Sequence, residues 1–247
     1  GDGLIKEYSK RLTSELGKGY SIQNLKDMRK FYQFIQKSQP LAVQFKNMNI
    51  TWSNVCEIMR ITNIEEIKYY LNLSHNLCLT KRQLRQRIKL DEYNRLPVEV
   101  KEKLRSNEVV STSEKLPSPV VLQDLKVDGK LTEKMAQTWI DENPIKFCNA
   151  LGEGYTYCGS QYKIKIGSNY NYIDVLLFNV VVEIKVTELK KEHIGQIETY
   201  MNYVDINLKK DFHNKTTGIL LVRENNKWLI KYINNDGIMI RKYVTSD

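Results

Sequence analysis

The sequence predicts two domains of different class. A mainly α-helical, helix-turn-helix-like amino-terminal domain is expected over residues 1–108, and an α/β carboxy-terminal domain, a mixed sheet flanked by helices, over residues 120–247. The first half shows helical spacing of apolar residues with repeated capping signals, whereas the second half shows short apolar runs typical of strands. The segment 109–119, which is rich in Ser and Pro, is the expected linker between them.

The net charge of +9 is concentrated in the first half of the chain. Residues 1–115 hold 21 Lys and Arg against 13 Asp and Glu, whereas the remainder holds 17 against 16. A basic half joined to a nearly neutral half indicates one module that binds a polyanion and a second module that acts on it. The alternative is a protein with a high pI and no nucleic-acid role.

Four helices can be located in the amino-terminal domain from their caps and apolar spacing. Ser21 precedes one apolar stripe, which consists of Leu25, Met28, Phe31, Tyr32 and Ile35. Thr51 or Ser53 caps a second helix, Asn63 opens a third, and Thr80 begins a fourth with a capping box. Several short helices with tight connections resemble a helix-turn-helix assembly.

The helix that begins after Thr80 is the expected DNA-binding element. Leu84 and Ile88 are expected to face inward. The cations expected on its other sides, as phosphate contacts, are Lys81, Arg82, Arg85, Arg87 and Lys89. The alternative is an ordinary solvated helix surface, because charged surfaces are common.

The carboxy-terminal domain is expected to run helix, three strands, helix, strand and a terminal hairpin. Residues 131–151 are predicted to be helical, with a kink or a new start at Pro144. Strands are expected at 155–158, at 162–166, around Asp174, around Glu183 and at 217–222, with a helix at 192–204. The last strands, 228–233 and 238–243, are expected to pair through a turn at 234–237.

Two neighbouring apolar runs in this domain carry an acid and a Glu-x-Lys sequence. If the chain turns at Phe178-Asn179, counting outward places Asp174 opposite Glu183. The strand period of two then puts Lys185 on the same face as Glu183. Two carboxylates and an ammonium would converge there, as a divalent metal ion and an attacking water require. The alternative is a pair of core strands that end in solvated charge.

Several other protein classes are disfavoured by the composition. Cys56, Cys78, Cys148 and Cys158 have no Cys-x-x-Cys spacing, which argues against a zinc site and a disulfide framework. No run reaches the ~18 apolar residues of a membrane span, and no signal peptide is visible. We therefore expect an intracellular protein, cytoplasmic or nucleoid-associated, with no membrane partner. His193 and His213 are expected at the surface.

The acid and the Glu-x-Lys sequence on adjacent strands resemble the PD-(D/E)XK nuclease superfamily, which implies a restriction-endonuclease-like fold. Gln196 and Tyr200 reproduce the Gln-x-x-x-Tyr signature of its RecB-like branch. A narrower resemblance is to the YhcG-type family, which combines an amino-terminal helix-turn-helix-like domain with such a nuclease domain. The motifs that carry it are Leu16–Ser21, Met28–Tyr32, Thr51–Ser53, Leu151–Tyr155, Gly159–Tyr162 and Tyr172–Asp174.

The resemblance implies a metal-dependent endonuclease that hydrolyses phosphodiester bonds in DNA, double-stranded or branched. Asp174, Glu183 and the backbone carbonyl of Ile184 would hold Mg²⁺ or Mn²⁺. Lys185 would orient or deprotonate the attacking water. Gln196 would position the water or a phosphate, and Tyr200 would support Gln196. Because double-strand cutting needs two active centres, we expect a homodimer.

Three positions depart from the pattern of this family. Ala150 lies where relatives often carry a helix acid, unless Glu142 or Glu153 substitutes for it, and Ser160 replaces a favoured Arg. Phe178-Asn179 is a poor two-residue turn, because Phe resists positive φ. The missing acid leaves open a silent nuclease fold that acts as a DNA-binding or assembly module. The residues also do not separate DNA from RNA as the substrate.

Overall fold

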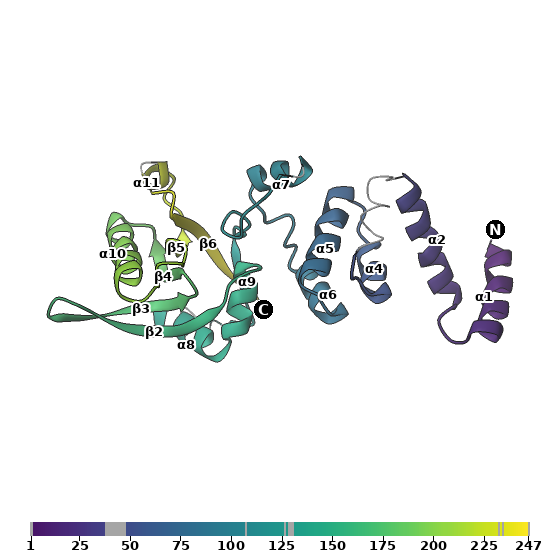
Figure 1. The fold of residues 1–247 in the computed structure, drawn as a ribbon, viewed down its shortest axis with the longest axis horizontal. Coiled ribbons are helices and arrows are strands. Elements are labelled where there is room, and N and C mark those ends of the chain that lie inside the picture. The colour runs from purple at the N-terminus through teal and green to yellow at the C-terminus, as the bar shows by residue number, and fades with distance from the viewer. Residues whose placement is uncertain are drawn as a thin grey trace. The chain divides into compact units, whose positions relative to one another are not determined.

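The computed structural model describes residues 2–37, 48–106, 108–125, 127, 131–231, 233 and 235–246. The chain forms two compact units, residues 1–93 and residues 94–247, called here the helical unit and the sheet unit (Figure 1). The linker expected at 109–119 stays a prediction. All four cysteines are free. None of the helices in these described ranges is long and apolar enough to cross a membrane.

The helical unit contains short helices with the caps that the sequence predicts. They are α1 (Asp2–Leu16), α2 (Ile22–Lys37), α4 (Trp52–Ile58), α5 (Ile64–Asn76) and α6 (Lys81–Lys89). Thr51 and Asn63 accept hydrogen bonds from the first turns of α4 and α5. Thr80 and Gln83 form the capping box of α6. These helix starts are therefore confirmed.

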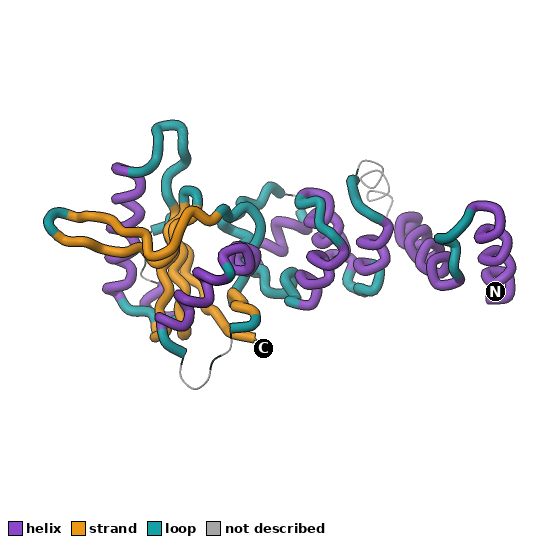
Figure 2. Tube along the Cα trace, turned by 90° about the horizontal axis from the view of Figure 1, so that it is seen from below, coloured by secondary structure: helices purple, strands orange, loops and turns teal. Residues whose placement is uncertain are grey.

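The sheet unit is built on one six-stranded mixed sheet, drawn in orange in Figure 2. Its elements are α7 (Val98–Arg105), β1 (Val120–Gln123), α8 (Glu133–Glu142), α9 (Pro144–Leu151), β2 (Tyr157–Ile166), β3 (Asn169–Leu177), β4 (Val180–Glu188), α10 (Lys191–Asn207), β5 (Thr217–Glu224), α11 (Lys227–Lys231) and β6 (Ile238–Ser246). The strand order is β1-β6-β5-β4-β3-β2. The pairs β2–β3 and β3–β4 are antiparallel, and the other neighbours are parallel.

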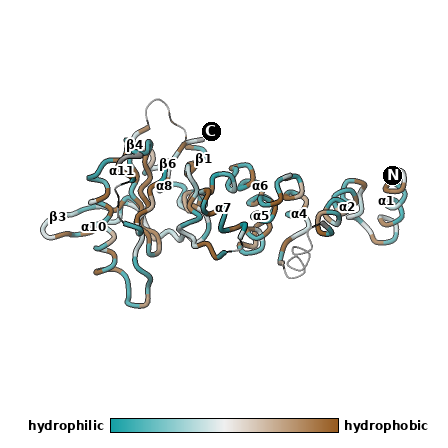
Figure 3. The backbone as a smooth tube through the Cα atoms, turned by 90° about the horizontal axis from the view of Figure 1, so that it is seen from above, coloured by the Kyte–Doolittle hydropathy of each residue, from teal (hydrophilic) through white to brown (hydrophobic). Residues whose placement is uncertain are grey.

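Helices cover both faces of this sheet, so the predicted mixed sheet flanked by helices is confirmed. On one face, Trp139 of α8 and Phe147 of α9 pack in a buried cluster with Val182 of β4. On the other face, Ile197 of α10 packs in a second cluster with Val181. Figure 3 shows hydrophobic segments along the central strands. Because successive residues of a strand alternate between faces, Glu183 follows Val181 onto the α10 side.

The carboxy-terminal hairpin is the main error of the sequence prediction. Residues 227–231 form helix α11, and β6 pairs parallel with β5, so the connection is a crossover and not a tight turn. Residues 232 and 234 of the predicted hairpin lie outside the described ones. Strand β1 was not predicted, and the two short strands expected at 155–158 and 162–166 form one strand, β2.

Candidate active site

The candidate site lies where β3 and β4 separate. Their backbone pairing runs from Leu177↔Val180 to Val175↔Val182, in the register that the sequence predicts. Beyond that point two carboxylates replace the backbone ladder. The amide of Asp174 donates to Glu183 Oε1 at 3.2 Å, and the amide of Ile184 donates to Asp174 Oδ2 at 2.9 Å. The predicted convergence of Asp174 and Glu183 is therefore present. We call this point the fork, because β3 and β4 diverge here and each carboxylate accepts a hydrogen bond from a backbone amide of the other strand.

Lys185 joins the same cluster from β4, as the strand period predicts. Its Nζ donates to Glu183 Oε2 at 3.2 Å. The side chains of Glu183 and Lys185 are 1% and 13% exposed. A buried ion pair of this kind needs further hydrogen bonds to offset the loss of hydration. The amide of Asp174 supplies one of them.

The cluster contains more negative than positive charge. Burial, together with the charge of Asp174, raises the pKa of Glu183 to about 7. Burial also raises the pKa of Asp174. For Lys185, burial acts to lower the pKa, but the charges of Glu183 and Asp174 outweigh it and raise the pKa. Two buried carboxylates thus share one ammonium.

This donor set fits a hard divalent cation. Carboxylate and carbonyl oxygens are the ligands that Mg²⁺ takes, and a second positive charge would balance the buried acids. No cluster of three or more His, Cys, Asp or Glu that could hold a metal occurs among the described residues. The site therefore offers the carboxylates of Asp174 and Glu183 and the neighbouring backbone as its donors.

The turn between the two strands is compatible with its sequence. Asn179 alone has a positive φ there, +57°, which Asn tolerates better than most residues. Phe178 keeps negative φ, so the expected conflict does not arise. Its amide donates to the carbonyl of Thr156 at 2.9 Å.

A chain of side-chain amides leads to Asp174 from β2 and α8. Gln161 Nε2 donates to Asp174 Oδ1 at 3.3 Å and to Gln137 Oε1 at 3.1 Å. Gln137 Nε2 donates in turn to Asp141 Oδ1 at 2.8 Å and to the carbonyl of Asp174 at 3.4 Å. Both amide groups are thereby oriented, because the Asp141 carboxylate only accepts.

Gln161 holds this place with a strained backbone. Its φ is +46°, although it lies inside β2 and is not glycine. Such conformations cost about 1–3 kcal/mol and cluster at functional sites. The preceding Ser160 donates to Asp141 Oδ1, and Tyr157 donates to Ser160 Oγ at 2.8 Å. Ser160, where the family resemblance implies Arg, thus anchors the far end of the amide chain.

The signature residues of α10 contact each other. Gln196 Nε2 donates to Tyr200 Oη at 3.2 Å, as expected for positions i and i+4 of one helix face. Within the described part of the chain, no hydrogen bond or ion pair joins them to Asp174, Glu183 or Lys185. They lie on the helix that covers the Glu183 side of the sheet.

His193, expected at the surface, is buried instead. It is 7% exposed, and its Nδ1 accepts a hydrogen bond from the amide of Lys190 in the first turn of α10. Burial, followed by the charge of Lys185, lowers its pKa. The prediction was wrong because the first turn of α10 is polar throughout, and the sequence does not indicate which of its side chains folds back onto the backbone.

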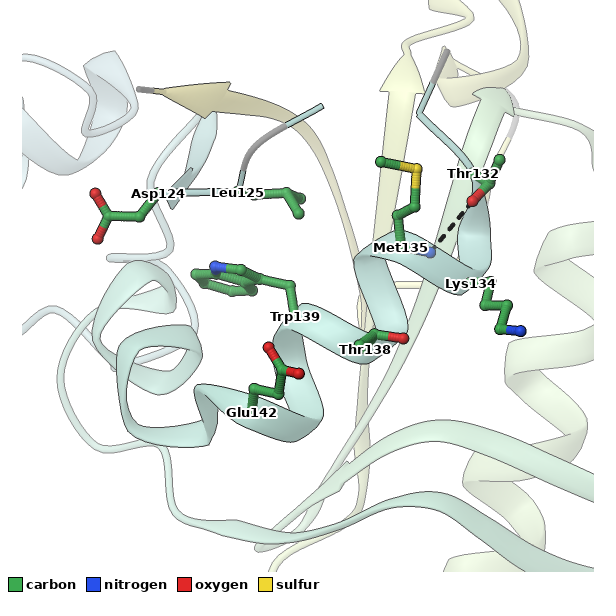
Figure 4. A pocket seen from close by; sticks show the side chains of 8 residues that line it. All are labelled: Asp124, Leu125, Thr132, Lys134, Met135, Thr138, Trp139 and Glu142. Atoms are coloured by element: carbon green, nitrogen blue, oxygen red, sulfur yellow. Dashed lines mark hydrogen bonds between the residues drawn. The ribbon is translucent and has the colours of Figure 1, made fainter. Parts of the chain in front are cut away.

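Neither Glu142 nor Glu153 supplies the helix acid that the family resemblance implies near Ala150. Ala150 is buried in the core. Glu142 lines a separate pocket of about 420 Å³ beside Trp139 (Figure 4). Glu153 is ion-paired with Lys115. The sequence reasoning missed Glu133, at the start of α8, whose charge adds to the larger effect of burial in raising the pKa of Asp174.

The cations of α6 differ in how far they are already paired. Lys81 and Arg85 are bound by Glu57, at 3.3 and 2.6 Å. Arg87 is buried, and its Nη1 donates to both carboxylate oxygens of Glu92 at 3.0 Å. The expectation that Arg87 lies on an outer side of the helix is therefore corrected. Arg82 and Lys89 are exposed.

Two families match most of the chain. Residues 113–246 match the family described as YhcG PDDEXK nuclease domain, and residues 1–95 match the DUF1016 N-terminal domain. The Escherichia coli (strain K12) protein named "Putative nuclease YhcG" is 23% identical over an alignment of 263 positions, which covers 91% of this chain and 70% of that protein.

One solved structure is also similar to part of the chain, a repair endonuclease from Pyrococcus abyssi. The identity is 19% and the TM-score is 0.33. The match covers 47% of this chain and 49% of that one, so the chain spans about half the length of that relative.

Proposed function

The chain belongs to the family of the YhcG PDDEXK nuclease domain, and from this we propose that it is a metal-dependent endonuclease acting on DNA. The observation that carries the proposal is the fork of β3 and β4. There Asp174, Glu183 and Lys185 meet, and the two acids outnumber the cation. A purely structural pair of strands gains nothing from a buried charge cluster of this kind, because each buried charge costs free energy.

We propose that Asp174, Glu183 and the carbonyl of Ile184 hold Mg²⁺ or Mn²⁺. Both acids have a raised pKa, which supports the assignment, because a divalent cation would remove the unfavourable charge. The bound ion supplies Lewis-acid stabilisation of the phosphate and a lowered pKa of water. Glu133 is an additional acid in electrostatic reach of Asp174.

The remaining residues act on the water and the phosphate in this proposal. Lys185 Nζ, held by Glu183 as an ammonium, orients the attacking water and balances charge on the scissile phosphate. Gln196 positions the water or a phosphate oxygen, and Tyr200 fixes its amide through their hydrogen bond. The product is a cut phosphodiester in double-stranded or branched DNA.

We propose that the helical unit binds the same DNA through the basic helix α6, in the manner of a helix-turn-helix protein. Arg82 and Lys89 are the exposed cations of α6 for which the described residues provide no ion pair, and Lys81 and Arg85 extend this surface. Arg87 supports the surface from inside. The variant Arg82→Gln/Lys89→Gln should flatten the salt dependence of DNA binding by about two units of log–log slope. An unchanged slope would remove α6 from the DNA interface.

A homodimer is part of the same proposal, because cutting both strands needs two centres. The mass of the full chain in solution, by light scattering with and without duplex DNA, tests it. A monomer in both conditions would contradict it.

The direct test is cleavage of supercoiled plasmid and of a branched duplex with Mg²⁺ or Mn²⁺. We expect cutting that Asp174→Asn and Lys185→Met reduce about 10³-fold or more. Glu188→Gln is the matched control, because Glu188 is an exposed acid on the same strand as Glu183. Equal activity of all variants would contradict the assigned site.

One observation favours a second candidate function. Ala150, at the position where the family resemblance implies a helix acid, is buried in the core. A silent nuclease fold that binds DNA as an assembly module would have this property. DNA binding by the full chain without cleavage of either substrate, with either metal, would favour this second function.

A further inference from the structure

The outer part of the β2–β3 hairpin is a two-stranded ribbon, residues 162–173. Its pairs run from Tyr162↔Ile173 to Ile166↔Asn169. Strand β3 pairs with β4 only over residues 175–177, so the ribbon has no third strand beside it. Figure 1 shows this hairpin projecting from the sheet.

The two faces of the ribbon differ in burial. Residues directly opposite each other in an antiparallel pair share a face. Lys163↔Tyr172 and Lys165↔Tyr170 therefore lie on one face, called here the outer face. Tyr170 and Tyr172 are 58% and 47% exposed. On the opposite side Ile164 is buried in the cluster under α10, which anchors the ribbon.

The outer face is positively charged. The segment 157–173 contains no Asp or Glu. Lys163 Nζ lies 3.9 Å from the centre of the Tyr170 ring, and Lys165 Nζ lies 5.9 Å from it. The described residues provide no ion pair for either lysine. Two neighbouring ammonium groups beside exposed aromatic rings are suited to a polyanion with flat bases.

The ribbon leads directly to the candidate active site. Gln161, two residues before Lys163 in β2, donates its side-chain amide to Asp174, two residues after Tyr172 in β3. At about 3.3 Å per residue, Tyr170 lies roughly 13 Å from Asp174 along the strand. A nucleic-acid strand that passes Asp174 would therefore lie along the lysines and tyrosines.

We propose that the outer face of the ribbon is a DNA-binding arm of the sheet unit. Lys163 and Lys165 contact phosphates on one side of the scissile bond, and Tyr170 and Tyr172 pack against sugars or bases. This inference rests on the proposed nuclease function. It adds a substrate contact next to the cut that is separate from the basic helix α6.

The test is binding of the full chain to a labelled 30-base-pair DNA duplex, in EDTA and over about 50–200 mM salt. Lys163→Gln/Lys165→Gln should weaken binding roughly 10-fold and make the log–log salt slope shallower by about two units. Tyr170→Leu/Tyr172→Leu should weaken binding several-fold and leave the slope unchanged. All four side chains are exposed, and melting curves check that the variants stay folded.

The control variant is Lys210→Gln/Lys215→Gln, which makes the same charge change elsewhere. Both lysines are exposed and flank His213, whose ring contacts Phe178 at the opposite end of β3. This variant should bind as the unmodified chain does.

The outcomes separate the ribbon from the proposed nuclease function. If the unmodified chain binds and cuts DNA but the ribbon variants behave like the control, the ribbon assignment is overturned and the nuclease function stands. If the ribbon variants lose binding but metal gives no cutting, the nuclease function fails and the arm stands. Ribbon-dependent binding of RNA but not DNA overturns the assignment to DNA. Absence of any binding and cutting overturns both.

Discussion

The two units bury acidic residues in opposite ways. In the helical unit, Glu57 is 5% exposed and is contacted by Arg85, Lys81 and Arg60. In the sheet unit, Glu183 is fully buried beside a second acid, and Lys185 is the cation it contacts. Hydrogen bonds from Arg85 lower the pKa of Glu57, whereas burial and Asp174 raise that of Glu183 to about 7.

This difference distinguishes a buried charge that serves the fold from one that serves chemistry. An acid surrounded by cations is already compensated, so it fixes helices and offers nothing to a ligand. A pair of acids with one cation is left with charge that a metal ion can balance. Both clusters contain acids and cations, and they differ in the number of cations available to each acid.

The largest effect is expected from breaking the compensated pair Arg87–Glu92. Arg87→Leu leaves the buried carboxylate of Glu92 without its cation, which should lower the free energy of unfolding by about 3–5 kcal/mol. Urea unfolding measures it. Arg82→Leu on the same helix is the control, with a change within about 0.5 kcal/mol because Arg82 is exposed. Similar values for both variants would contradict the role of Arg87.

Glu183, called here the underpaired acid because it shares one cation with Asp174, should make the free energy of unfolding depend on pH in an unusual way. The folded pKa of Glu183 is about 7 against an ordinary value of 4.5, so folding disfavours its ionised form. This cost is absent below about pH 4.5, grows as pH rises from there to about 7, and then stays constant at about 3 kcal/mol at most. In EDTA, Glu183→Gln should therefore stabilise the protein at pH 8 but not at pH 4.5.

Glu57, the acid compensated by three cations, should change the free energy of unfolding with pH in the opposite direction. Because the pKa of Glu57 is lowered, its contribution is present above pH 4.5 and is lost as pH falls through the folded pKa. Urea unfolding of Glu57→Gln and Glu183→Gln across pH 4–8 measures both. If the free energy of unfolding changed with pH in the same way in both variants, the proposed difference between Glu57 and Glu183 would be contradicted.

A divalent cation should stabilise the sheet unit through the underpaired acids alone. At pH 8, Mg²⁺ at 100 times its Kd should raise the free energy of unfolding by about 2.7 kcal/mol. Asp174→Asn should abolish the gain and Glu57→Gln should keep it. The gain should shrink at pH 5, because Glu183 is then protonated. An equal gain in Asp174→Asn would mean that the ion binds elsewhere.

The smallest effect concerns the strained backbone of Gln161. Gln161→Ala and Gln161→Gly both remove the amide that orients Asp174, and both should lower cleavage about 10–100-fold. Glycine accepts φ of +46° without strain, so the Gly variant should be more stable than the Ala variant by about 1 kcal/mol. Melting of the two variants measures this. An Ala variant at least as stable as the Gly variant would show that the strain is absent.

The parts of the fold that depend on local pattern could be predicted from the sequence. Helix starts at Thr51, Asn63 and Thr80 follow from hydrogen bonds within four residues. The approach of Asp174 to Glu183 follows from counting back from one turn, because the strand period is two.

The pairing of strands that are distant in sequence leaves no comparable local pattern. The sequence of α11 contains Trp and Ile, which favour strands, and a helix of five residues is too short to show helical periodicity. Strand β1 pairs with β6, more than a hundred residues later, so nothing near 120–123 indicates its partner.

The side-chain partners around the site were equally hidden. Gln161 binds Asp174 and Glu133 acts on it by its charge, both from other elements, and the left-handed conformation of Gln161 cannot be read from its type. Arg87 was expected outside because arginine is mostly exposed, and its pairing with Glu92 reversed that.

The pairing of β1 with β6 has a consequence for how the protein is made. The acids of the fork come from β3 and β4, which are joined by a short turn and are close in sequence. The sheet edge, by contrast, requires β6, which emerges last. The residues of the fork therefore leave the ribosome well before those of β6, and the pairing of β1 with β6, a contact of high sequence separation, is expected to form slowly.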